Sequence, residues 1–98
     1  MLEDLTIESF QPLVGTSFWL TTDNNRKIEL RLTRAAKVME SEAARLKRTA
    51  FSIFFVAPVM LPQHIYRLTH EEFAEPLDIF LVPLGKEASG FIHEAVFT

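Results

Sequence analysis

The sequence predicts a mainly β domain, a small antiparallel six-stranded sandwich or partly open barrel with a short N-terminal helical turn. Apolar and polar residues alternate over several short runs, as they do in strands with one buried face. Turn-forming residues separate these runs at intervals of roughly 8 to 12 residues. Helical patterns do not alternate with the strands, so a parallel α/β sheet is not expected.

The length and composition predict one domain over residues 1–98. The chain has 98 residues, 48% of them hydrophobic, and nine are Phe, which suits a single packed core. It has no cysteine, so disulfides and thiolate metal sites are excluded, and a reducing compartment fits. The start at Met1–Asp4 is acidic, and no apolar run approaches the roughly 18 residues of a membrane helix. We therefore expect a cytoplasmic protein that does not contact a membrane.

The first half of the chain predicts a helical turn followed by a β-hairpin. Residues 6–14 carry apolar side chains at helical spacing, with Thr6 as N-cap and Pro12 limiting the length. A strand over residues 16–21, a turn at Thr22–Asn25 and a strand over residues 27–33 then form the hairpin. The period of two places five apolar residues on its inner face: Phe18, Leu20, Ile28, Leu30 and Leu32.

Residues 35–49 admit two interpretations. Strong helix formers dominate the segment, and Ala35, Met39, Ala43 and Leu46 fall near one face of a helix. That apolar stripe is thin, so we favour a variable charged loop with at most a short helix. The alternative is a long strand end followed by a charged loop.

The second half predicts four more strands, at residues 50–57, 65–70, 77–82 and 91–97. The first of them is apolar on both faces apart from Ser52, which is typical of a central strand. Pro58 ends it, and Pro83 and Gly85 are expected to stop the strand that begins at Leu77.

Charge is distributed unevenly along the chain although the formal net charge is only −3. Residues 26–48 hold eight basic and three acidic residues, a net charge of +5. Residues 71–94 hold six acidic residues and Lys86, a net charge of −5. If the fold places the two stretches on different surfaces, the molecule has two poles, which favours association with a partner or another copy.

No catalytic, cofactor or metal constellation is recognisable. The three histidines, His64, His70 and His93, do not form a zinc-site spacing, and structural roles in a turn and a strand are the simpler interpretation. None of the serines lies in a nucleophile elbow, and the three glycines are too scattered to cradle a phosphate. We therefore expect a protein that is not an enzyme and uses no cofactor or metal.

Two segments are candidates for protein interaction. The loop residues Val59, Met60 and Leu61 are three large apolar side chains in a row, which either fold back as a lid on the core or meet a partner. The second candidate is the basic cluster of Arg45, Lys47 and Arg48. Nucleic acid is a weaker alternative for this cluster, because the sequence pI is about 5.5 and aromatics do not interleave with the basic residues.

Several short motifs resemble a family of small single-domain bacterial proteins of unknown function. They are FSIFF at 51–55, LPQ at 61–63, YRLTH at 66–70, FLVPLG at 80–85 and EAVF at 94–97. The resemblance covers nearly the whole chain and implies a compact β domain, with some members encoded near phage-tail-collar-like proteins. It supplies no catalytic residues. The chain departs from it at His93, where a Tyr is expected, and over residues 35–49.

These observations favour a non-enzymatic protein-interaction or assembly module, which the resemblance links to a phage-tail-like structure. A small-ligand-binding β-barrel is the first alternative, with Trp19, Tyr66 and His93 near a pocket. A nucleic-acid-binding accessory protein is the second.

Overall fold

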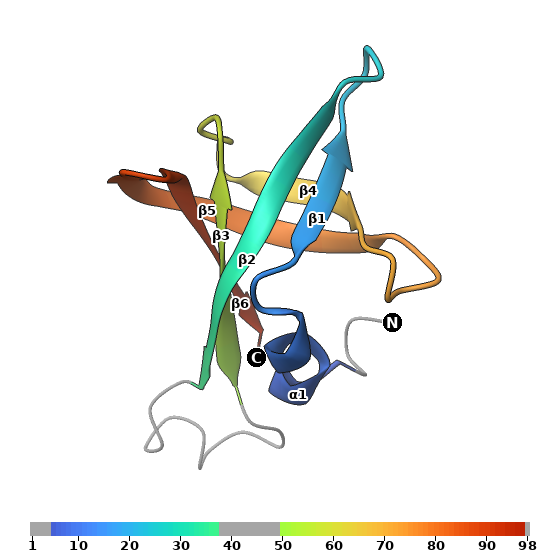
Figure 1. Cartoon of the computed structure of the whole chain (residues 1–98), viewed down its shortest axis with the longest axis vertical. Coiled ribbons are helices and arrows are strands. Elements are labelled where there is room, and N and C mark those ends of the chain that lie inside the picture. The colour runs from blue at the N-terminus through green and yellow to red at the C-terminus, as the bar shows by residue number, and fades with distance from the viewer. Residues whose placement is uncertain (1–4, 38–49, 98) are drawn as a thin grey trace.

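The computed structural model describes residues 5–37 and 50–97 (Figure 1). A short helix α1 (Ile7–Phe10) continues into a 3-10 turn η2 (Gln11–Leu13). Six strands follow: β1 (Ser17–Thr21), β2 (Lys27–Lys37), β3 (Phe51–Ala57), β4 (His64–Thr69), β5 (Leu77–Glu87) and β6 (Gly90–Phe97). The predicted helical turn and six strands are confirmed.

The strands form a closed antiparallel barrel in the order β1-β2-β3-β6-β5-β4. The sandwich is therefore not formed, and the barrel is closed rather than partly open. Closure occurs between β1 and β4, which pair only at Trp19 with Thr69 and at Leu20 with Leu68. Every other neighbouring pair is registered over five or more residue pairs. The β1–β4 ladder is thus the short seam of the barrel.

The core lies inside the barrel and continues to the end that α1 covers (Figure 1). In the hairpin of β1 and β2, Phe18, Leu30 and Leu32 are buried, and Leu20 and Ile28 are partly buried, so the predicted inner face is confirmed. Phe10 of α1 extends this core with ring centroids 5.4 to 6.4 Å from those of four other aromatics: Phe18, Phe51, Phe73 and Phe97. The helical turn therefore covers one end of the barrel with an aromatic cluster.

The strand β2 is longer than predicted. The expected loop or short helix over residues 35–49 is wrong at residues 35–37, which pair with β3, as the long-strand alternative requires. The register shifts between Leu32 and Arg34, and Thr33 at this bulge donates a hydrogen bond from Oγ1 to the Phe54 carbonyl over 3.3 Å. Pairing with β3 overrides the helix propensity of the two alanines. Residues 38–49 lie outside the described residues.

The strand β5 is also longer than predicted, because Pro83 and Gly85 do not end it. The register with β6 shifts between these two residues, which leaves Leu84 out of the pairing, and the strand continues to Glu87. A proline lacks the N–H that a regular ladder needs, and a bulge is a place where a sheet tolerates this loss.

Candidate functional site

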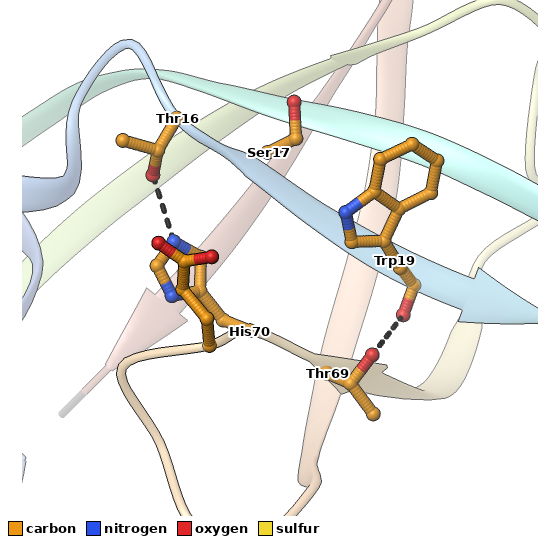
Figure 2. Close-up of a pocket in the computed structure, with 6 residues that line it drawn as sticks. Thr16, Ser17, Trp19, Thr69 and His70 are labelled. Carbon is orange, nitrogen blue, oxygen red and sulfur yellow. Dashed lines mark hydrogen bonds between the residues drawn. The ribbon is translucent and has the colours of Figure 1, made fainter.

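A pocket with a volume of about 520 Å³ lies at the seam where β1 meets β4 (Figure 2). Its lining comes from the start of β1 and the end of β4: Thr16, Ser17, Trp19, Thr69, His70 and Glu71. The two strands diverge there after only two paired positions, so the pocket is a direct consequence of the short seam.

His70 holds the two sides of the pocket together. Its Nδ1 accepts a hydrogen bond from the Glu72 N–H over 3.0 Å, so in the neutral ring the proton is on Nε2. Nε2 then donates to Thr16 Oγ1 over 2.8 Å (Figure 2), and Thr16 Oγ1 donates to the Leu13 carbonyl over 2.6 Å. The His70 ring also lies 4.5 Å from that of Phe18. His70 therefore has a structural role in a turn, as the sequence predicts.

The pocket leaves an aromatic face and a carboxylate available to a ligand. Ser17 donates a hydrogen bond to Glu29, and Thr69 Oγ1 donates to the Trp19 carbonyl over 3.4 Å (Figure 2). Within the described part of the chain, the Trp19 indole and the Glu71 carboxylate make no hydrogen bond. Trp19 is 39% exposed and is the only tryptophan of the sequence.

In the described part of the chain, Trp19, Tyr66 and His93 do not line one common pocket, although the sequence predicts one around them. Of these three residues, only Trp19 lines the seam pocket. The Tyr66 hydroxyl donates to the Pro62 carbonyl over 2.6 Å, and His93 is fully buried inside the barrel. Alternation along β6 turns His93 to the interior together with Ala95 and Phe97, which fills the space that a ligand would need.

His93 fixes the loop between β3 and β4. Its Nε2 accepts a hydrogen bond from the Leu61 N–H over 2.9 Å, and Nδ1 has no hydrogen-bond partner among the described residues. Burial lowers the pKa of His93, because the charged imidazolium loses its hydration inside an apolar barrel. A neutral ring with Nε2 as acceptor is therefore the form that holds Leu61.

The predicted interaction loop contains both inward and outward side chains. Leu61 is only 6% exposed and joins the core, whereas Val59 and Met60 are 45% and 53% exposed. Leu61 therefore acts as a lid on the core, whereas Val59 and Met60 are available to a partner. The basic candidates Arg45, Lys47 and Arg48 lie outside the described residues.

An apolar pair on the outer face of the barrel was not found from the sequence. Ile65 of β4 and Phe80 of β5 lie directly opposite each other in the ladder and are 57% and 49% exposed. The next outward pair is the salt bridge between Arg67 and Asp78, 2.9 Å from Nε to Oδ1, and hydrogen bonding to Arg67 lowers the pKa of Asp78. The sequence feature that could have indicated this pair is that residues 77–82 are apolar on both faces of the strand. In a closed barrel, one of those faces is outside.

The strands β2 and β5, which belong to the basic and the acidic stretch, lie on opposite sides of the barrel. The strand β5 is the third neighbour of β2 in either direction around the six-stranded ring. Figure 1 shows β2 in front, with β4 and β5 crossing behind it. Residues 26–37, which contain β2, hold five basic residues and Glu29, a net charge of +4. Residues 71–94, which contain β5, have a net charge of −5.

Among residues 5–37 and 50–97, no three His, Asp or Glu side chains lie close enough to hold a metal ion. In the same residues no helix is long and apolar enough to cross a membrane.

A family model described as "Domain of unknown function (DUF6916)" matches residues 5–97 of the chain. The chain belongs to the DUF6916 family. The predicted resemblance to a family of unknown function is thereby confirmed, and the barrel from α1 to β6 is the DUF6916 domain. No curated protein and no solved structure matches the chain.

Proposed function

We propose that this DUF6916 protein is a non-enzymatic interaction module that binds another protein through the outer face of β4 and β5. The observation that carries the proposal is the exposed pair of Ile65 and Phe80, directly opposite each other in the ladder. Val59 and Met60, in the loop that leads into β4, are exposed as well. We call Val59, Met60, Ile65 and Phe80 the apolar face.

The physical argument is the cost of leaving this surface in water. Burying apolar area stabilises a complex by about 25 cal/mol per Å², and large side chains at the centre of an interface contribute most. The salt bridge between Arg67 and Asp78 is next in the ladder and would form part of a polar rim. A central apolar pair beside charged residues is the usual composition of a protein interface.

The sequence resemblance suggests a setting for this interaction. Some proteins that the chain resembles are encoded near phage-tail-collar-like proteins, and tail-like structures are built from many contacting protein subunits. We therefore propose assembly into such a structure in the cytoplasm as the specific form of the function.

The test compares matched exposed residues. A doubly substituted variant, Ile65→Ser with Phe80→Ser, should lose complexes that the wild type forms in size-exclusion chromatography with light scattering and in pull-downs from the source cells. Val96→Ser is the control, because Val96 is 56% exposed but belongs to β6. Equal complex formation by the double variant and the wild type, or a wild type that forms no complex in either assay, would rule out the apolar face as the interaction site.

A second candidate function is the binding of a small polar molecule in the seam pocket. The specific observation is that the exposed Trp19 and the carboxylate residue Glu71 line the same pocket of about 520 Å³. Because Trp19 is the only tryptophan, its fluorescence reports on this pocket alone. A saturable fluorescence change with one member of a panel of saccharides and amino acids, lost in Glu71→Gln, would support this function, and an unchanged spectrum across the panel would count against it.

A further inference from the structure

We infer that copies of this chain dock head to tail, the basic β2 face of one copy on the acidic face around β5 of the next. This inference rests on the proposed function and names its partner as a second copy. The charge argument and the position of the apolar face support it independently.

The basic face is a row of exposed side chains along β2. Lys27 and Arg31 alternate with the inward residues Ile28, Leu30 and Leu32, and Arg34 follows the bulge on the same outer side. Glu29 lies between Lys27 and Arg31 on this side and accepts a hydrogen bond from Ser17, so the row keeps a net positive charge of two. All three basic side chains are exposed. The same alternation that fills the core places them on the outer side of the barrel.

The acidic face lies across the barrel. Glu72 and Glu75 are exposed in the loop between β4 and β5, and Glu87 is exposed at the end of β5. Asp78 of β5 is exposed as well, but its carboxylate is paired with Arg67. Ile65 and Phe80 lie in the ladder that follows this loop. The proposed contact therefore presents carboxylates and the apolar pair together.

Long basic side chains match both parts of this face. Their ends pair with carboxylates, their aliphatic stems cover apolar surface, and guanidinium groups stack on aromatic rings. The chain already makes such a contact internally, because Arg34 lies over the Phe54 ring with Cζ 5.3 Å from the centroid. A basic row on β2 is thus suited to Phe80 and Ile65 of another copy as well as to the glutamates.

The position of the two faces determines the kind of assembly. They are different surfaces on opposite sides, so a contact between them is heterologous and leaves one free face of each kind at the ends. Such contacts propagate into a ring or a filament. Charge steering between exposed groups makes the association dependent on salt.

The experiment is sedimentation velocity over a wide range of protein concentration, at low and high salt. The wild type should form oligomers at low salt that dissociate at high salt. Two charge-reversal variants, Lys27→Glu with Arg31→Glu and Glu72→Lys with Glu75→Lys, should each stay monomeric. Their equimolar mixture should assemble, because each supplies a face complementary to the other's. Glu8→Lys changes an exposed charge on α1 that belongs to neither set of reversed residues, and it should assemble like the wild type.

Three results would overturn head-to-tail docking. They are a wild type that is monomeric at every concentration in low salt, reversal variants that still assemble alone, and a mixture that remains monomeric. Circular dichroism of each variant shows that it is folded. If the wild type is monomeric but Ile65→Ser with Phe80→Ser abolishes a complex with another protein, self-assembly is wrong and the proposed function stands. Salt-sensitive retention of the monomer on DNA would assign the β2 face to nucleic acid instead.

Discussion

His93 accepts a hydrogen bond through Nε2 from the Leu61 backbone N–H, over 2.9 Å, inside the barrel. The bond joins β6 to the loop between β3 and β4 and holds Leu61 against the core. In the same loop, Val59 and Met60 remain at the surface. One buried side chain thus fixes which loop residues are core and which are part of the apolar face.

Folding stability should decrease as the pH falls below about 6.5. Burial lowers the pKa of His93 from 6.5, so below that pH the unfolded chain binds a proton that the folded chain does not. The contribution of one such group is at most about 1.4 kcal/mol per pH unit, and it levels off below the pKa of the folded state. Urea unfolding at a series of pH values measures the slope. His93→Gln keeps an acceptor for Leu61 without this titration, and we expect a shallower slope. Identical slopes would contradict the prediction.

Leu61→Ala should destabilise the protein by about 2 to 4 kcal/mol, because it leaves a cavity beneath the loop. The neighbouring change Met60→Ala should stay within about 0.5 kcal/mol, because Met60 is exposed. Urea unfolding of both variants gives the comparison. If the two substitutions cost the same, Leu61 is not a lid on the core.

The elements of the fold were predictable where a strand carries its own pattern. Residues 27–33 alternate without interruption, and this local signal fixed both the strand and its inner face. The bulges at Thr33 and after Pro83 were not predictable, because a register shift is a relation between two strands. Unless the partner strand is known, the sequence shows only helix formers after Thr33 and a strand breaker at Pro83.

The candidate sites were predictable only in part, for a similar reason. Three apolar residues in a row indicated that the loop at 59–61 matters, but only the hydrogen bond that the Leu61 N–H donates to His93 separates Leu61 from the others. The seam depends on the contact between Thr16 and His70, which are 54 residues apart. The outward position of Phe80 follows from barrel closure, which the sequence left open.

Gly90→Ala should destabilise the protein by about 1 to 3 kcal/mol or more. Gly90 has a φ of +142°, and a Cβ there would lie 2.6 Å from the Ala57 carbonyl oxygen, where β6 begins beside β3. Gly85→Ala is the matched control, because a Cβ at Gly85 meets nothing within 4 Å. Thermal unfolding of the two variants measures the difference. A control as unstable as Gly90→Ala would show that the loss does not arise from the close approach to Ala57.

His70→Ala should loosen the seam of the barrel before it affects the rest. The substitution removes the link to Thr16 and the acceptor of the Glu72 N–H, and β1 is otherwise held to β4 at only two residue pairs. Removing hydrogen bonds of this kind costs about 1 to 3 kcal/mol. Hydrogen exchange should therefore accelerate more at the amides of β1 than at those of β3, which pairs along its whole length with β6. His64→Ala removes an exposed ring from the other end of β4 and should leave the exchange of β1 unchanged. Uniform acceleration in β1 and β3 would mean that the barrel opens as one unit and that His70 does not specifically hold the seam.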